Sequence, residues 1–180
     1  MATLRKARAY SKKYARPYTR ISKKKSKSFI KTVPQTKIVK YNIGNKKAFD
    51  EKKFNTIVSL ISEENVQIRD NALEASRQAI ARELDKNIPG QYYFEVRIYP
   101  HHILRENKML TGAGADRMQT GMTQSFGKTI GRAALVKPGQ EIFIIATSGN
   151  KQIKLSRTLF SSVKSKLPCK TKIITNILQQ

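Results

Sequence analysis

Residues 56–98 decide the fold class, and they read TIVSLISEENVQIRDNALEASRQAIARELDKNIPGQYYFEVRI. Residues 56–61 form a short, mainly apolar segment that is rich in β-branched side chains, and this pattern predicts a strand. A helix is predicted from Glu64 or Asn65 to about Asn87, because Pro89-Gly90 follows and cannot continue it. Apolar and polar residues then alternate over residues 92–99, which predicts a second strand. The order strand, helix, strand therefore lies at the centre of the chain.

The predicted helix and the strand after it each have one apolar face. In the helix this face is formed by Val66, Leu73, Ile80 and Leu84, with Ala72, Ala75 and Ala79 beside it. In the strand it is formed by Phe94, Val96 and Ile98. Arg97 faces the other way. A layer of helix packed on a layer of sheet would bury both apolar faces.

Three more elements are predicted downstream. Residues 133–136 and 141–147, joined by a Lys137-Pro138-Gly139 turn, have the pattern of a β-hairpin. A second amphipathic helix is predicted over residues 151–166, with these side chains inward: Ile153, Leu159, Phe160, Val163 and Leu167. Residues 172–178 are predicted to form the last strand. The predicted fold class is α+β, a mainly antiparallel sheet with two amphipathic helices packed on it.

Charged residues are unevenly distributed along the chain. The 180 residues carry 36 Lys and Arg against 12 Asp and Glu, a formal net charge of +24, and a polyanion is the usual partner of such an excess. Residues 1–49 hold sixteen of the basic residues and no acidic one. Residues 50–100 have a net charge of −2, as expected for a folded core, and residues 101–180 have +10. We therefore predict a basic nucleic-acid-binding extension over residues 1–49 and an α+β domain over residues 50–180.

The extension also carries aromatic residues. Tyr10, Tyr14 and Tyr18 recur every four residues, and Arg16-Pro17-Tyr18-Thr19-Arg20 places one ring between two guanidinium groups. Rings and guanidinium planes both stack on unpaired RNA bases, so the pattern favours RNA contact. The alternative is a solvated basic tail whose tyrosines pack on its own domain.

A long loop is predicted over residues 102–131. The stretch has little periodicity, and it holds five of the nine glycines. A loop of this length inside a domain is functional or disordered. Its basic residues outnumber its acidic ones, and glycine lets the backbone come close to a crowded partner.

The sequence predicts no enzyme, cofactor or metal site. Residues 121–129 end like a phosphate-binding P-loop, but position 122 is Met where the first glycine is required. The glycine pattern that begins at Gly112 resembles a dinucleotide fingerprint, but it ends in Arg117 instead of glycine. His101 and His102 are adjacent on an extended stretch and should face opposite ways, so they cannot easily share a metal.

The surroundings of the protein can also be predicted. The single Cys169, expected to be a small buried hydrophobe, excludes an internal disulfide and a zinc site built on paired cysteines. No stretch approaches the roughly 18 apolar residues that span a bilayer, and residues 1–10 lack the apolar region of a secretory signal. The few leucines of residues 1–49 and their excess of Lys over Arg argue against an organellar transit peptide. We expect a reducing compartment and no membrane partner.

Several ordered blocks carry a resemblance to a known family. They are Ser62-Glu63-Glu64, Gln67-Ile68-Arg69, Asn71-Ala72-Leu73-Glu74-Ala75, Arg97-Ile98-Tyr99-Pro100-His101, Leu104-Arg105-Glu106-Asn107-Lys108-Met109, Thr111-Gly112-Ala113-Gly114-Ala115-Asp116-Arg117, Gly121-Met122 and Phe126-Gly127-Lys128. Upstream, Arg16-Pro17-Tyr18-Thr19-Arg20, Val33-Pro34 and Lys37-Ile38 extend the match. The chain resembles, over nearly its whole length, the large-subunit ribosomal protein family called L ten-e in archaea and eukaryotes, which is homologous to bacterial L sixteen.

The resemblance implies a structural, non-enzymatic protein of the cytoplasmic ribosome. It would sit in large-subunit rRNA beside the corridor of the aminoacyl-site tRNA, in contact with neighbouring ribosomal proteins. A loop over about residues 102–122 would reach toward the peptidyl transferase centre and the acceptor arms of the tRNAs at the aminoacyl and peptidyl sites. The protein would support subunit assembly and tRNA placement. On charge alone, a DNA-compacting protein is the alternative.

Charge and resemblance together select the candidate binding residues. Those expected to bind rRNA are Arg16, Tyr18, Arg20, Lys23, Lys24, Lys25, Lys37, Arg69, Arg97, Arg105, Lys108, Arg117, Lys128 and Arg132. The resemblance places near tRNA the residues Lys108, Met109, Gly112, Gly114, Asp116, Arg117 and Gly121.

Overall fold

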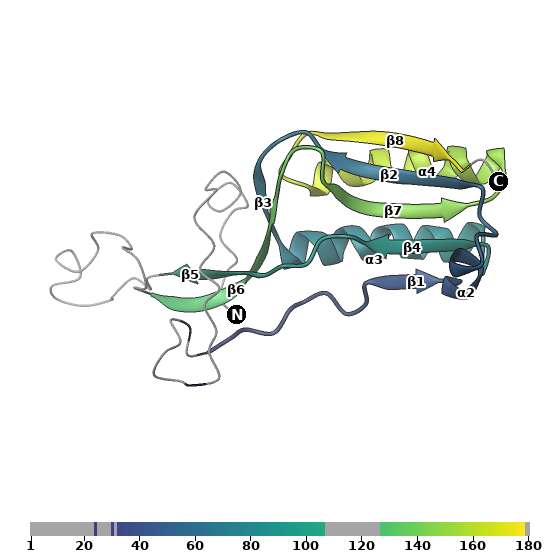
Figure 1. Ribbon diagram of the computed structural model, residues 1–180. Coiled ribbons are helices and arrows are strands. Elements are labelled where there is room, and N and C mark those ends of the chain that lie inside the picture. The colour runs from purple at the N-terminus through teal and green to yellow at the C-terminus, as the bar shows by residue number, and fades with distance from the viewer. Residues whose placement is uncertain (1–23, 25–29, 31, 107–126, 179–180) are drawn as a thin grey trace, which may run out of the picture.

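Two antiparallel sheets form the framework of the protein. The computed structural model describes residues 24, 30, 32–106 and 127–178 (Figure 1). The five-stranded sheet has the order β1 (Asn42–Gly44), β4 (Tyr92–Val96), β7 (Glu141–Thr147), β2 (Thr56–Ser62) and β8 (Thr171–Ile177). The three-stranded sheet has the order β3 (Val66–Arg69), β6 (Lys128–Val136) and β5 (His102–Glu106).

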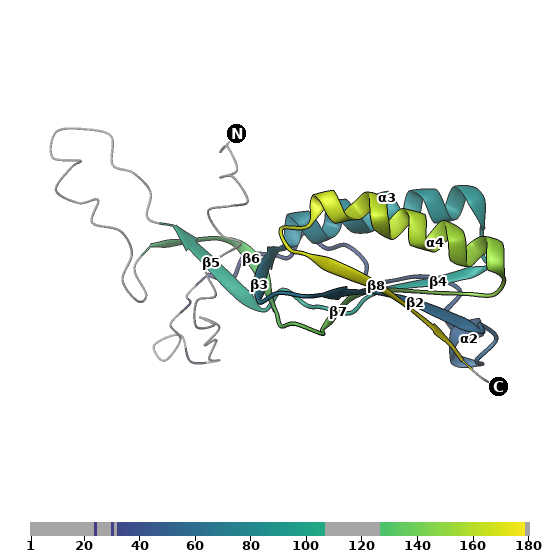
Figure 2. The same cartoon turned by 90° about the horizontal axis from the view of Figure 1, so that it is seen from above.

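Two long helices cover one face of the five-stranded sheet. They are α3 (Asp70–Asn87) and α4 (Asn150–Val163), and Figure 2 shows both on the same side of the strands. A 3-10 turn, η3 (Lys164–Lys166), continues α4, and the short helix α2 (Lys46–Asp50) follows β1. The five-stranded sheet and its helices are called the body here. The three-stranded sheet is called the arm, because it extends away from one end of the body (Figure 1).

The core of the body lies between this sheet and the two helices. Leu73, Ile80 and Leu84 of α3 and Phe160 of α4 are all fully buried there. From the sheet, Phe94 and Phe143 pack with their ring centroids 5.7 Å apart. Because the apolar stripes of both helices face this core and all strand pairs are antiparallel, the predicted α+β class is confirmed.

The predicted start of the first helix is wrong. Residues 66–69 form strand β3, which pairs with residues 133–136 of β6, and α3 begins only at Asp70. Val66 is buried, but in this strand and not on the helix. Its spacing of seven residues from Leu73 equals about two helical turns, but the two residues belong to different elements, so the match is a coincidence. Ala75 is exposed, so only Ala72 and Ala79 of the three predicted alanines pack against the core.

The predicted β-hairpin is also wrong. β6 pairs with β3 and β5 in the arm, whereas β7 pairs with β2 and β4 in the body. The turn between them exists, with Gly139 at φ +80°, but it is bonded to the end of β2: the Gly139 N–H donates to the Ser62 carbonyl at 2.8 Å. Both edges of each strand are therefore occupied by other partners, and the turn is where the chain crosses from arm to body.

Smaller differences concern the ends of elements. β4 stops at Val96, α4 stops at Val163, and β8 runs one residue earlier than predicted. β5 and β6 occupy the two ends of the stretch predicted as a loop over residues 102–131. Within the predicted extension, residues 42–50 form β1 and α2, and Ile38 joins the core. No helix in the described part of the chain is long and apolar enough to cross a membrane.

Candidate nucleic-acid interface

The arm collects basic side chains from three strands. Arg69 comes from β3, Arg105 from β5, and Lys128 and Arg132 from β6. Glu106 is the only acidic residue in these strands. Pairing of β5 and β6 brings residues about 25 positions apart in the sequence side by side, with Ile103 opposite Arg132 and Glu106 opposite Lys128. Four of the predicted RNA-binding residues thus share one narrow sheet.

The basic segment of residues 32–41 lies along the arm (Figure 1). Arg132 donates from Nε to the Pro34 carbonyl at 2.6 Å, and the Thr129 hydroxyl donates to the Thr32 carbonyl at 3.1 Å. Lys37 and Lys40 of this segment are exposed. The contacts attach the start of this lysine-containing segment to the basic arm.

Two carboxylates of α3 hold the same segment against the body. The Lys37 N–H donates to Asp70 Oδ2 at 3.2 Å, and the Val39 N–H donates to Glu74 Oε2 at 3.4 Å. Between them, Ile38 is only 4% exposed. The main chain of Lys37 is therefore fixed while its side chain remains at the surface, a suitable arrangement for a phosphate contact.

Glu74 is kept ionised by its neighbours. Arg77 donates to both of its carboxylate oxygens, from Nη2 at 2.5 Å and from Nε at 2.7 Å. The hydrogen bond from Arg77 lowers the pKa of Glu74 below its usual range, helped by Gln78 and the Val39 N–H and opposed by burial. The charged form is the one that accepts hydrogen bonds most strongly, so this pairing stabilises the attachment of residues 37–39.

An aromatic cluster lies where the arm leaves the body. The ring centroids of Tyr41 and Tyr99 are 5.4 Å apart at an interplanar angle of 23°, and those of Tyr99 and His101 are 4.5 Å apart at 48°. Arg132 Nη1 donates to the Tyr99 hydroxyl at 3.1 Å. Sequence reasoning missed this cluster, because Tyr41 and Tyr99 are far apart in the chain. The only local signal was the aromatic spacing in Tyr99-Pro100-His101.

The two histidines face opposite ways, as predicted. His101 is exposed, whereas His102 is only 6% exposed in the arm. Burial, with a smaller effect of the Arg105 charge, lowers the pKa of His102, so the buried imidazole is neutral at neutral pH. His102 is thus a structural residue of β5.

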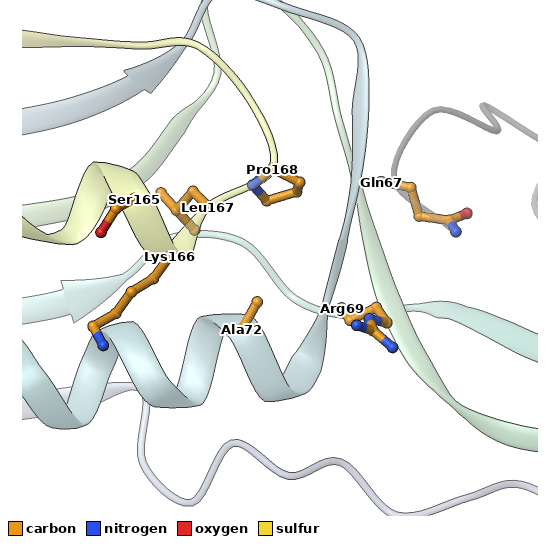
Figure 3. A pocket seen from close by; sticks show the side chains of 7 residues that line it. All are labelled: Gln67, Arg69, Ala72, Ser165, Lys166, Leu167 and Pro168. Atoms are coloured by element: carbon orange, nitrogen blue, oxygen red, sulfur yellow. The ribbon is translucent and has the colours of Figure 1, made fainter. Parts of the chain in front are cut away.

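A hollow of about 250 Å³ lies at the junction of arm and body. Figure 3 shows the residues that line it, Gln67, Arg69, Ala72, Ser165, Lys166, Leu167 and Pro168. Arg69 reaches it from β3 and Lys166 from η3 (Figure 3). These two cations make the rim basic, so the positive surface of the arm continues onto the end of the body.

Comparison with known proteins identifies the family of the chain. The family described as "Ribosomal protein L16p/L10e" matches residues 16–174. The chain belongs to the ribosomal protein L16p/L10e family. It is 44% identical over 175 residues to the large ribosomal subunit protein uL16 of Methanococcus maripaludis strain C7, covering 95% of this chain and 93% of the relative. The proteins of the same name from Hyperthermus butylicus and Pyrobaculum calidifontis are 41% and 39% identical, and this chain covers 90% and 92% of them.

Family membership confirms the resemblance found in the sequence, and it makes the chain a ribosomal protein. The relatives that match over nearly their full length are named as large ribosomal subunit proteins. In the described part of this L16p/L10e chain, no group of three or more His, Cys, Asp or Glu side chains could hold a metal ion.

Two further predicted residues can be placed in the L16p/L10e fold. Arg97 lies between two carboxylates, with Nη1 3.4 Å from Glu95 and Nε 3.5 Å from Glu141, so its charge is partly balanced. Cys169 is half-buried and packs against the core, and burial raises the pKa of its thiol. The predicted burial of Cys169 is therefore only partial.

Most predicted residues of the extension and the loop lie outside the described residues. These are Arg16, Tyr18, Arg20, Lys23, Lys25, Lys108, Met109, Gly112, Gly114, Asp116, Arg117 and Gly121. Lys24 is described and exposed. The roles of all these residues, Lys24 included, stay predictions.

Proposed function

We propose that this chain is a structural component of the large ribosomal subunit and that it binds rRNA through the arm, residues 32–41 and the N-terminal extension. The observation that carries the proposal is the gathering of Arg69, Arg105, Lys128 and Arg132 on one narrow sheet, to which Arg132 attaches the segment of residues 32–41. Its relatives are named as proteins of the large ribosomal subunit, which supports the same role. Neighbouring ribosomal proteins are its expected protein partners.

Phosphate contact explains why this surface needs Arg and Lys. Each ammonium or guanidinium group that meets a phosphate releases condensed counterions, so affinity for RNA rises steeply as salt falls. The two hydrogen-bond partners that fix Arg132 are the Pro34 carbonyl and the Tyr99 hydroxyl. Both are neutral, so these contacts do not balance its positive charge. Arg97 contributes less on this reasoning, because it already contacts two carboxylates.

The finer part of the proposal concerns tRNA. β5 ends at Glu106 and β6 begins at Lys128, and both of these ends lie at the far end of the arm from the body (Figure 1). We infer that residues 107–126 are carried by the arm into the subunit, beside the aminoacyl-site tRNA and toward the peptidyl transferase centre. Catalysis there would belong to the RNA, and the protein would position the tRNA acceptor arms.

Removing two arm charges tests the rRNA interface. For large-subunit rRNA, the double variant Arg105→Gln/Lys128→Gln should lower the magnitude of the slope of log K against log salt by about 1.5. Each lost phosphate contact accounts for about 0.7–0.9 of this change. The matched control is Lys151→Gln/Arg157→Gln, which removes two exposed charges from α4. Equal slopes for the two double variants would contradict the proposal. Co-sedimentation with large subunits after a wash at raised salt would test the role in the cell.

A further inference from the structure

We propose that His101 and Tyr99 form a stacking site for a single unpaired RNA base. The proposal rests on the proposed rRNA-binding function and adds to it a second kind of contact, made to the face of a base instead of to phosphate. An aromatic ring can stack on any base, so such a site anchors an RNA strand without reading its sequence.

The exposure of the rings is the first observation. Tyr99 is 42% exposed and is the most exposed Phe or Tyr in the described part of the chain. By contrast, Tyr92, Tyr93, Phe94, Phe143 and Phe160 are all at most 2% exposed. His101 is exposed as well, although its ring packs on Tyr99. The fold thus buries five of its large rings almost completely and leaves these two at the surface, on the basic side of the molecule.

The second observation is that the rings are held in place before any partner arrives. Tyr41 stacks on Tyr99, and Arg132 Nη1 donates to the Tyr99 hydroxyl at 3.1 Å. The His101 N–H donates to the Tyr99 carbonyl at 3.0 Å, and Pro100 between them is buried. A ring that is already fixed loses little conformational entropy on binding, so stacking on it is efficient.

The third observation is the charge around the cluster, which favours RNA over an apolar protein segment. Apart from Arg97, which two carboxylates contact, residues 32–41, 98–106 and 127–132 hold five basic residues and one acidic residue. The Asp70 carboxylate near Tyr41 accepts a hydrogen bond from the Lys37 N–H. Phosphates on either side of a stacked base would meet these cations. An unpaired base is required, because bases inside a duplex already stack on both faces.

The alternative is that the cluster only clasps residues 32–41 onto the arm. Tyr41 and the Arg132 contact with Pro34 serve that role. The exposed ring of His101 is the part of the cluster that a clasp does not need, so the test is made at this residue.

The test compares full-length proteins with Ala, Leu or Phe at position 101. The probes are a 12-nucleotide oligo-uridine carrying one central 2-aminopurine and a 12-base-pair RNA duplex. His101→Phe keeps an aromatic face and His101→Leu keeps only apolar bulk. Ile177→Ala, at a position 74% exposed on β8, is the control for loss of an exposed apolar side chain.

We expect His101→Leu and His101→Ala to bind the single strand about 5-fold or more weakly than wild type. His101→Phe and Ile177→Ala should match wild type, and duplex binding should not change. The 2-aminopurine fluorescence should be quenched by wild type and by His101→Phe alone among the position-101 variants. Melting curves confirm that each variant is folded at the assay temperature.

Three outcomes would overturn the inference, each for its own reason. Equal single-strand affinities of the Phe and Leu variants would show that the aromatic face is irrelevant. An equal loss on the duplex would assign the effect to charge. Unchanged affinity of His101→Ala would restrict the cluster to a clasp. Failure of wild type to bind either RNA would instead overturn the proposed function.

Discussion

Single residues decide how the N-terminal segment attaches to the body. Glu74 accepts hydrogen bonds from Arg77, Gln78 and the Val39 N–H, all of which favour its ionised form. Because the pKa of Glu74 is lower in the folded protein than its ordinary value of 4.5, ionisation stabilises the fold. This stabilisation is complete above the unfolded pKa and is lost as the pH falls through the lowered folded pKa.

We therefore expect Glu74→Gln to be less stable than wild type at pH 6. The difference should shrink as the pH falls below about 4.5, because the carboxyl of the unfolded chain then binds a proton before folded Glu74 does. Urea denaturation of both proteins at pH 6 and pH 3 measures this difference, with Glu83→Gln at a half-buried position of the same helix as a further comparison. A difference that does not depend on pH would show that the carboxylate charge is not what matters.

Gly44 is a second decisive residue, because its backbone and its surroundings both exclude a side chain. Its φ is +92°, and a Cβ built there would overlap the Tyr92 carbonyl oxygen. Gly139 has a similar φ of +80° but nothing within 4 Å of an added Cβ. The two glycines thus separate backbone strain from crowding.

Gly139→Ala should lower the free energy of unfolding by about 1–2 kcal/mol, because a residue with a Cβ is strained in the left-handed conformation. Gly44→Ala should cost more, because β1 must also move away from β4. Denaturation curves of the two variants give the comparison, and hydrogen exchange of the Asn45 N–H, which donates to the Tyr92 carbonyl at 2.9 Å, should accelerate only in Gly44→Ala. Equal costs and equal exchange would contradict the crowding.

At the scale of elements, the two long helices stabilise the body through their apolar stripes. Leu73 of α3 and Phe160 of α4 are both fully buried in the same core. Leu73→Ala should cost about 2–5 kcal/mol and Phe160→Ala about 3–5 kcal/mol, from lost burial and from the cavity left behind. Ala75→Ser, at an exposed position of α3, is the control and should have little effect. Wild-type-like melting of both core variants would contradict the stripes.

At the scale of the whole molecule, we expect the extension to have two roles, in RNA binding and in the fold, that truncation can separate. Residues 1–29 hold eleven of the sixteen basic residues that precede Asp50. Ile30 and Ile38 are buried, and β1 pairs with β4, so Ile30 and residues 32–49 also belong to the fold.

Deleting residues 1–29 should flatten the salt dependence of rRNA binding while the melting temperature stays nearly unchanged. If only a quarter of the eleven charges meet phosphate, the magnitude of the slope of log K against log salt should fall by about 2–2.5. Deleting residues 1–49 should in addition lower the melting temperature, because buried side chains and an edge strand are lost. An unchanged slope after the shorter deletion would refute the binding role of the extension.

Residues 107–126 allow a test of the role in translation. Replacing them by a short glycine linker between β5 and β6 should leave the stability of the body nearly unchanged, since its core lies elsewhere. We expect such a protein to enter large subunits in normal yield and to weaken tRNA binding at the aminoacyl site. Subunit profiles and tRNA binding are measured on the same ribosomes. Normal yield with undiminished tRNA binding would contradict the proposal, and a lack of mature subunits would indicate an assembly role.

Local patterns in the sequence were sufficient for the fold class and for the kind of partner. The apolar stripe of Leu73, Ile80 and Leu84 repeats at helical spacing, and residues 56–61 are β-branched, so each element is encoded within its own residues. The excess of Lys and Arg does not depend on folding at all, which is why it pointed to nucleic acid directly. The opposite exposure of His101 and His102 followed from strand geometry alone.

Only the tertiary structure decided which elements meet. Residues 133–136 pair with residues 66–69 and not with residues 141–147, although both partners have suitable strand patterns. Tyr41, Tyr99 and Arg132 come together from three distant parts of the chain. Residues 37–39 bind to carboxylates of α3 more than thirty positions away. Such contacts depend on how separate segments lie relative to one another in the folded protein. They leave no periodic pattern in the sequence of either partner, so the arm and its basic surface could be recognised only in the tertiary structure.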